Sequence, residues 1–90
     1  MSLVTGAQIR AGRALLGWSR ERLARAADIH RNAVGYWEAR GPAAGDAAEY
    51  SYALHHIAKA LHAAGVELVC DPAPGVRFRT RAQAEAMALN

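Results

Sequence analysis

The sequence contains a single cysteine, Cys70, and no apolar run long enough to span a membrane. One cysteine excludes an internal disulfide and a zinc site built from cysteines, and it fits a reducing compartment. A membrane-spanning helix needs roughly 20 apolar residues, and the N-terminus also lacks the basic and then apolar pattern of a signal peptide. We therefore expect a soluble, cytoplasmic protein without a membrane partner.

Aromatic residues are also few, at 7% of the chain, although apolar residues of all kinds reach 52%. Alanine supplies much of that apolar fraction. A chain of 90 residues is expected to form one domain with a single small core. Its helices must pack closely through small side chains, with a few large anchors such as Trp37.

Positive charge is concentrated in the first part of the chain. Residues 1–40 have seven arginines against three acids, a net charge of +4, whereas residues 41–90 have four basic residues against five acids, a net charge of −1. An arginine-rich face attracts polyanions by releasing counterions, and arginine can fork onto phosphate or guanine. A solvated basic surface explains the composition equally well, so the charge supports a nucleic-acid partner only together with a motif.

Two short helices joined by a tight turn are predicted over residues 18–38. The first has Ser19 as its N-cap, and the second begins near His30. The first helix has apolar positions at helical spacing, namely Leu23, Ala24 and Ala27. The second has Val34 and Trp37 on one face. The opposite face is left with Arg31, Asn32, Gly35 and Tyr36.

The flanking elements are also helical by capping and periodicity. A capping box of Thr5 and Gln8 predicts a helix over residues 6–16 that ends at Gly17. Its inward positions are Ile9, Leu15 and Leu16, and its outward ones Arg10 and Arg13. A loop over 41–45 precedes a long helix, capped by Asp46 with Glu49, that ends near Ala64 and closes the core over residues 30–38. Its inward positions are Tyr50, Ala53, Leu54, Ile57, Ala58 and Leu61.

After Gly65 the period changes to two, which predicts a hairpin with strands near 66–70 and 76–79. An isolated hairpin is only marginally stable, so this one must pair with a second chain or fold on its own helices. We favour pairing across a homodimer.

A further box of Thr80 with Gln83 opens a last segment with Met87 and Leu89. This segment is either a short docked helix or one that orders only with a partner.

In these features the chain resembles the Cro and phage-repressor type of helix-turn-helix, the Xre family, and in particular its small bacterial members. The matching residues are Gln8-Ile9-Arg10, Leu15-Leu16-Gly17-Trp18-Ser19, Leu23-Ala24, Ala27, Arg31-Asn32-Ala33-Val34, Trp37-Glu38, Ala60-Leu61 and Ala63-Ala64-Gly65-Val66-Glu67. We expect a mostly α fold, a repressor-like helix-turn-helix bundle of four to five helices with a C-terminal β-hairpin. Residues 1–65 form the DNA-binding domain, and the hairpin and tail over 66–90 form the dimerisation element.

Three positions depart from the family pattern. Asp28 stands where glycine is common in the turn, and Asp adopts left-handed backbone more readily than most residues. His30 replaces the usual Ser or Thr cap of the recognition helix. Arg20 replaces the Gln that often opens the preceding helix, which keeps a phosphate contact but removes the amide.

The resemblance places Arg31, Asn32 and Tyr36 where the family contacts bases. Arginine can bond guanine, asparagine can bond adenine, and tyrosine can contact a base or phosphate. A solvated Arg31 and a partly buried Tyr36 are the alternatives. Gly35 costs roughly 1 kcal/mol in a helix. Close approach to DNA or to the helix over residues 6–16 would explain this cost. The complete set of expected DNA contacts is Arg20, His30, Arg31, Asn32, Gly35, Tyr36 and Arg40.

We expect no catalytic residue, metal site or cofactor. His55 and His62 share a helix face but lie about 10 Å apart, too far for one metal ion within one chain. A metal bridging two chains is the alternative for the histidines. Cys70 is interpreted as a buried structural thiol. Glu38 is interpreted as structural, paired with Arg10 or Arg13.

These features predict a transcriptional regulator, most consistent with a repressor that occupies an operator as a homodimer. One alternative is an antitoxin-like regulator whose C-terminal segment holds a protein partner. A second is an interaction module that keeps the fold but no longer binds DNA.

Overall fold

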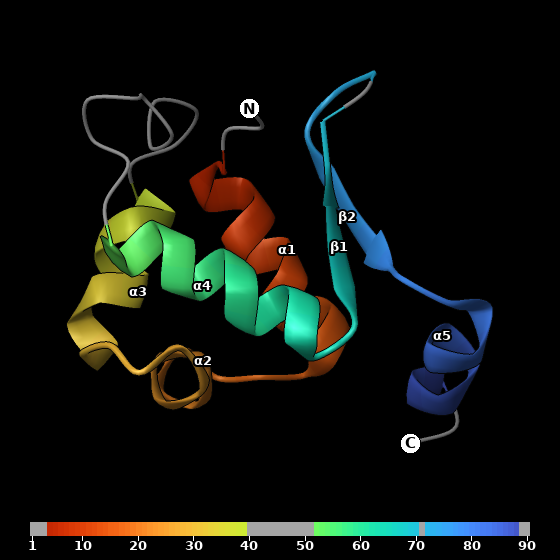
Figure 1. The fold of residues 1–90 in the computed structure, drawn as a ribbon, viewed down its shortest axis with the longest axis horizontal. Coiled ribbons are helices and arrows are strands. Elements are labelled where there is room, and N and C mark those ends of the chain that lie inside the picture. The colour runs from red at the N-terminus through yellow and green to blue at the C-terminus, as the bar shows by residue number, and fades with distance from the viewer. Residues whose placement is uncertain (1–3, 40–51, 71, 89–90) are drawn as a thin grey trace.

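The computed structural model describes residues 4–39, 52–70 and 72–88, and within them it is mostly helical with one hairpin, as predicted (Figure 1). The elements follow in the order α1 (Gly6–Leu16), α2 (Arg20–Ala27), α3 (Arg31–Ala39), α4 (Tyr52–Ala63), β1 (Val66–Val69), β2 (Gly75–Phe78) and α5 (Arg81–Ala88). Helices α1 to α4 surround the core, and the hairpin lies along one side of them. The expected loop over 41–45, the cap of Asp46 with Glu49, and Tyr50 lie outside the described residues.

The ends of α1 and α2 are fixed by the local signals that the sequence predicts. Thr5 and Gln8 form a complete capping box, and Gly17 ends α1 in left-handed backbone with φ 68°. The Ser19 side chain accepts a hydrogen bond from the Arg22 N–H at the start of α2. Asp28 ends α2 with φ 58°, so the turn is made by a non-glycine residue, at the cost that left-handed backbone has for such residues.

His30 caps the start of α3. Its ring Nδ1 accepts a hydrogen bond from the Asn32 N–H at 3.1 Å, and its carbonyl accepts one from the Ala33 N–H at 2.9 Å. An imidazole nitrogen thus takes the place of the hydroxyl or carboxylate oxygen that usually caps a helix. The predicted role of His30 as a cap is confirmed.

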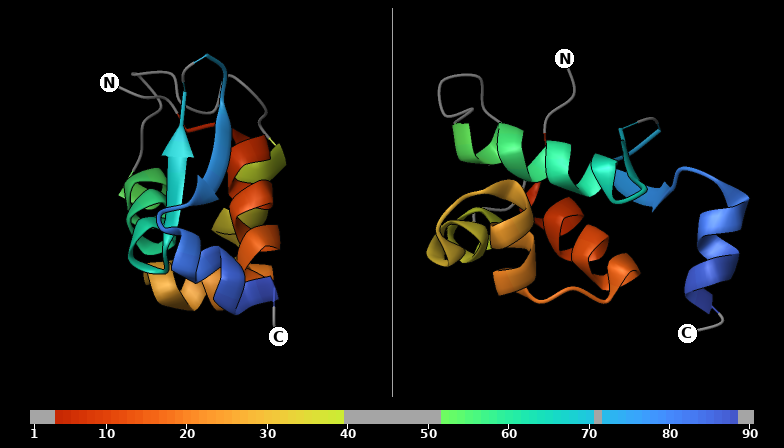
Figure 2. Two further views of the ribbon diagram at one scale, coloured as in Figure 1. Left: turned by 90° about the vertical axis from the view of Figure 1, so that its right-hand side faces the viewer. Right: turned by 60° about the horizontal axis from the view of Figure 1, so that its bottom comes forward.

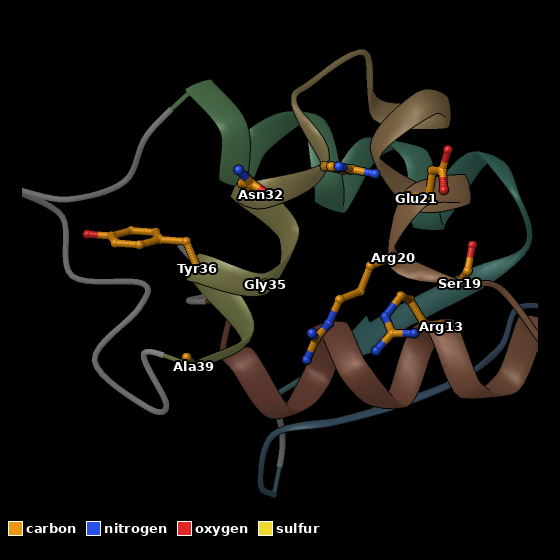
Figure 3. Close-up of a pocket in the computed structure, with 9 residues that line it drawn as sticks. Arg13, Ser19, Arg20, Glu21, Asn32, Gly35, Tyr36 and Ala39 are labelled. Atoms are coloured by element: carbon orange, nitrogen blue, oxygen red, sulfur yellow. The ribbon is translucent and has the colours of Figure 1, made fainter.

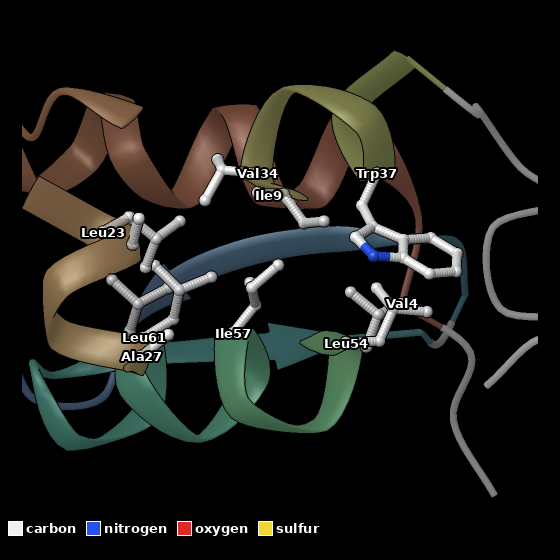
Figure 4. Close-up of a cluster of buried hydrophobic side chains, with 11 residues drawn as sticks. Val4, Ile9, Leu23, Ala27, Val34, Trp37, Leu54, Ile57 and Leu61 are labelled. Carbon is white, nitrogen blue, oxygen red and sulfur yellow. The ribbon is translucent and has the colours of Figure 1, made fainter. Parts of the chain in front are cut away.

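The core lies between α1 to α4 and β1, and its large apolar side chains are almost completely buried (Figure 4). Leu54, Ile57 and Leu61 of α4 are all 0% exposed, as their spacing predicts. A Cβ at Gly12 of α1 would lie 3.1 Å from a Leu61 methyl, so the absence of a side chain lets these two helices approach closely. Helix α4 packs mainly on α2 and β1, with a smaller contact on α3.

The hairpin packs on α1 and α4 of its own chain. Its antiparallel register pairs Val66 with Phe78 and Leu68 with Val76, and Val66 is completely buried in the core. On the other face Glu67 and Arg77 form an ion pair at 2.7 Å. The structure therefore realises the alternative of a hairpin folded on its own helices, and pairing across a homodimer stays a prediction.

Helix α5 extends from the end of β2, away from α1 to α4 (Figures 1 and 2). Its start has the predicted box, in which Thr80 and Gln83 exchange two hydrogen bonds of 3.1 Å. None of its residues is buried, and its main contact is with β2. Met87 is half-buried, and Leu89 lies outside the described residues. Within the described ranges, no helix has both the length and the apolar composition to cross a membrane.

Candidate nucleic-acid interface

An open groove of about 850 Å³ lies between the start of α2 and the outer face of α3 (Figure 3). Five residues predicted to contact DNA line it, namely Arg20, Arg31, Asn32, Gly35 and Tyr36. Four further residues of the described ranges also line it, namely Arg13, Ser19, Glu21 and Ala39. Side chains from two helices, predicted separately from the sequence, thus come together on one surface.

Helix α3 separates its apolar from its polar side chains as predicted. Val34 and Trp37 are buried against the core, whereas Arg31 and Asn32 are exposed. Tyr36 is 54% exposed, and its ring meets the Trp37 ring edge-on at 5.1 Å between centroids. It projects outward beside Gly35 in Figure 3. Trp37 therefore packs against the tyrosine ring, and Tyr36 remains more than half exposed.

Glu38 is the buried charged residue beneath the groove. Its side chain is only 1% exposed, and Arg13 binds it through Nε to Oε2 at 2.6 Å and through Nη2 to Oε1 at 3.1 Å. Arg13 also donates from Nη1 to the Trp18 carbonyl at 3.0 Å. The predicted structural pairing of Glu38 with Arg13 is confirmed. The expectation that Arg13 points outward is wrong, because its side chain is only 19% exposed and is required to satisfy the buried carboxylate.

The backbone at the end of α3 is satisfied by a second arginine of α1. Arg10 donates from Nη1 to the Glu38 carbonyl at 3.1 Å. This carbonyl is one of the last in α3, where a helix lacks internal donors and favours positive charge. At the same place α1 approaches closely, because a Cβ added at Gly6 would lie only 2.3 Å from the Glu38 carbonyl oxygen. The end of α3 is thus clamped to the start of α1.

Arg20 is the second cation on the Glu38 carboxylate. Its Nε lies 3.2 Å from Oε1, while its side chain stays 57% exposed. Among the described residues, a Cβ at Gly35 would contact only the Arg20 guanidinium, with Nη1 at 3.8 Å. Close approach to α1 therefore does not explain Gly35. Arg20, placed by sequence as a phosphate contact, turns out to bridge α2 and α3 within the chain as well.

Other predicted contacts stand differently. His30 is exposed and caps α3, but it does not line the groove. Arg40 lies outside the described residues. Sequence reasoning missed Arg13 as a lining residue, and the signal that could have found it is Glu38, since a carboxylate on the buried face of a helix requires a cation. Arg22 lies over the Trp18 ring, with 5.0 Å to the centroid, outside the groove.

The histidines of α4 take separate positions. His56 Nδ1 lies 3.1 Å from the Ala27 carbonyl and its ring packs on Tyr52 at 4.0 Å between centroids. His55 and His62 are exposed. Within the described ranges, no group of three or more His, Cys, Asp or Glu residues could hold a metal ion. Cys70 is half-buried, so the prediction that it is buried holds only in part.

Comparisons of the chain with protein-family models, curated proteins and solved structures find no match. The resemblance to the Xre family therefore remains an expectation from the residues quoted above.

Proposed function

We propose that the chain is an Xre-type transcriptional regulator that binds double-stranded DNA with the outer face of α3. The observation that carries the proposal is the shared groove, in which Arg31, Asn32 and Tyr36 of α3 lie exposed beside Arg20 of α2. The apolar residues of α3 face the core, so this polar face is available to a ligand. A helix with such a face fits the major groove of B-form DNA.

The chemistry of the exposed side chains supports base reading. Arg31 can donate two hydrogen bonds to guanine, and Asn32 can pair with the N6 and N7 atoms of adenine. Tyr36 offers a ring for a thymine methyl and a hydroxyl for a base or phosphate. The N-terminal end of α2 favours an anion. Arg31, Asn32 and Tyr36 of α3, together with Arg20 of α2, therefore present the hydrogen-bonding groups that a DNA-binding surface needs.

The regulator is proposed to act in the cytoplasm as a homodimer and to repress by occupying an operator. Dimeric helix-turn-helix proteins place two recognition helices at half-sites about one helical turn apart. A palindromic site with half-sites separated by about 10 base pairs is therefore expected. The hairpin and α5 are the segments proposed to join the two chains.

The test is selection of random-sequence duplexes by the purified protein at moderate salt. A variant with Arg31→Ala and Asn32→Ala is selected in parallel. A matched control carries Lys59→Ala and His62→Ala, which removes one basic and one polar side chain from exposed positions of α4 that do not line the groove. The wild type and the control should enrich the same palindrome, and the groove variant should lose it while keeping its circular dichroism spectrum. Failure of the wild type to enrich any sequence, with binding that vanishes as salt rises, would contradict the proposal.

One observation favours a second candidate, an antitoxin-like role in which the C-terminal segment binds another protein. Helix α5 has no buried residue and rests mainly on β2, although Met87 and Ala84 are half-buried on one side. A photoreactive residue in place of Met87 tests this role. A crosslink to a different protein in cells supports it, and crosslinks confined to this chain or a second copy argue against it.

A further inference from the structure

The guanidinium of Arg20 is held in one orientation before any ligand arrives. Its Nε bonds Glu38 Oε1 at 3.2 Å, and the Glu38 side chain is 1% exposed and fixed by Arg13. The two arginines lie side by side in Figure 3, with Arg20 between Arg13 and Gly35. A planar group attached through Nε to a buried, immobile carboxylate loses little conformational freedom on binding.

This attachment leaves the ligand-binding end of the guanidinium available. Arginine has five N–H donors, and the Nε donor is the one that Glu38 takes. Within the described residues, Nη1 and Nη2 of Arg20 make no hydrogen bond, and the side chain is 57% exposed in the groove. The remaining fork matches the paired acceptors O6 and N7 of guanine.

The position of Arg20 favours a base over a phosphate. The guanidinium lies beside Gly35, with Nη1 3.8 Å from the place of a Cβ there, in the groove that Arg31 and Asn32 also line. Gly35 has no Cβ, so the α3 backbone leaves room for a base edge next to the fork. A guanidinium fork can bond a phosphate as well as a base, and the two contacts differ in what they select: a guanine contact selects one base, whereas a phosphate contact selects none.

We propose that Arg20 reads a guanine in each half-site and that Glu38 is the positioning residue that orients it. This inference rests on the proposed DNA binding, and it replaces the phosphate contact expected from the place of Arg20 in the sequence. The guanine at this position should be preferred by about 5-fold to 150-fold over other bases, the range of one bidentate pair.

The test uses the full chain and the palindrome that the wild type selects. Arg20→Lys keeps the charge but removes the fork, and the side chain is exposed enough for the variant to fold. Arg25→Lys is the matched control, an exposed arginine of the same helix that does not line the groove. Arg20→Ala should lose the preference for guanine at one position of each half-site and keep the other positions, whereas Arg20→Lys, which can still donate to O6 or N7, should only weaken it. A synthetic site with 7-deazaguanine there, which lacks N7, should weaken the wild type and leave Arg20→Ala unchanged.

Glu38→Gln tests the positioning role, because glutamine has a similar size and no charge. The same guanine preference should fall, while the preferences set by Arg31 and Asn32 persist. A purely structural role for Glu38 would instead weaken binding at every position, and this result overturns the positioning role. If the variant does not fold, Arg20→Ala and the modified base still decide whether Arg20 reads the guanine.

Two outcomes overturn the inference and leave DNA binding intact. In one, Arg20→Ala binds all sites as the wild type does. In the other, Arg20→Ala weakens all sites equally and lowers the salt dependence by about one phosphate contact. A wild type that selects no sequence is a different result, because it removes the proposed function itself.

Discussion

Two buried polar side chains, Glu38 and Gln8, join α1 to other parts of the fold, and they differ in what they leave exposed. Both are 2% exposed. Gln8 accepts from the Thr5 N–H at 2.9 Å and donates from Nε2 to the carbonyls of Val69 at 2.9 Å and Gly75 at 3.0 Å. Its hydrogen-bonding groups are thus engaged between α1 and the hairpin. Its role is to hold the hairpin in place.

Glu38 is satisfied by side chains that themselves reach the surface. Arg13 encloses the carboxylate, and Arg20 touches it through one nitrogen while most of its side chain stays in solvent. The same burial that stabilises the bundle therefore also orients a cation in the groove. A buried polar residue can thus shape a surface when its partners keep donors that point outward, as Arg20 does beside Glu38 and as the backbone partners of Gln8 do not.

The largest expected effect comes from Glu38→Ala, which removes the buried carboxylate that binds Arg13 and Arg20. The change leaves Arg13, whose side chain is 19% exposed, without its counter-ion. We expect a loss of about 3 kcal/mol in the free energy of unfolding, measured by urea denaturation followed by circular dichroism. Glu85→Ala is the control, since it removes an exposed pair with Arg81 and should cost less than about 0.5 kcal/mol. Equal losses in the two variants would contradict the structural role of Glu38.

The next largest effect is expected from Gln8→Ala, which removes the buried amide that bonds the hairpin. Removing the amide leaves the Val69 and Gly75 carbonyls and the Thr5 N–H without this partner, which should cost about 2 kcal/mol. Amide hydrogen exchange should show earlier opening of β1 and β2 than in the wild type. Thr80→Ala is the control, because it removes an exposed residue from the capping box at the start of α5, whose two bonds join Thr80 and Gln83. If both variants open the hairpin equally, Gln8 does not hold it.

Local signals explain why much of the fold was predictable. The box of Thr5 with Gln8, the left-handed Gly17 and the turn at Asp28 each depend on residues within a few positions of one another. Hydrogen bonds of this kind are determined by neighbouring residues, and the apolar spacing of Leu54 and Ile57 then identifies the buried face. The helices and the hairpin were therefore predictable to within a residue or two where the structure describes them.

Partner choice across long separations was not predictable in the same way. Glu38 was expected to pair with Arg10 or Arg13, but helical spacing placed Arg13 outward on α1 and did not indicate that its side chain lies partly buried against a carboxylate 25 residues away. Likewise, the sequence identified Gln8 only as part of a helix capping box. Nothing in it indicated that Gln8 also bonds carbonyls 61 and 67 residues away. Those bonds seat the hairpin on its own chain, whereas pattern alone left a second chain as the favoured partner. The groove residues were predictable because they share one helix face, but the link from Arg20 to Glu38 was not.

Gly35→Ala tests whether DNA approaches closely at the groove, beside Arg20. A Cβ there would meet only the Arg20 guanidinium at an ordinary 3.8 Å among the described residues, so the free protein should gain about 0.5–1 kcal/mol in stability. DNA binding should nevertheless weaken by roughly tenfold, equivalent to about 1.4 kcal/mol, if a base edge occupies that space. Denaturation and duplex-binding titrations measure the two effects. Tighter or unchanged binding would contradict close approach of DNA at this position.

Gly6→Ala is the matched glycine variant at the buried contact between α1 and the end of α3. Its Cβ would lie 2.3 Å from the Glu38 carbonyl oxygen, so this variant should lose about 1–3 kcal/mol of stability. Opposite signs for the two glycine variants would separate a glycine required by the fold from one that the fold does not require.

The smallest expected effect concerns His30, the cap at the start of α3. His30→Ala removes the acceptor of the Asn32 N–H and should cost about 0.5–1 kcal/mol, whereas His30→Ser supplies a hydroxyl and should keep or slightly raise the stability. Both variants are measured by urea denaturation. Because His30 does not line the groove, neither change should alter which sequence is selected. A shift in the selected sequence with His30→Ser would mean that the imidazole contacts DNA as well as capping α3, and the binding surface would then extend past Arg31 to the turn.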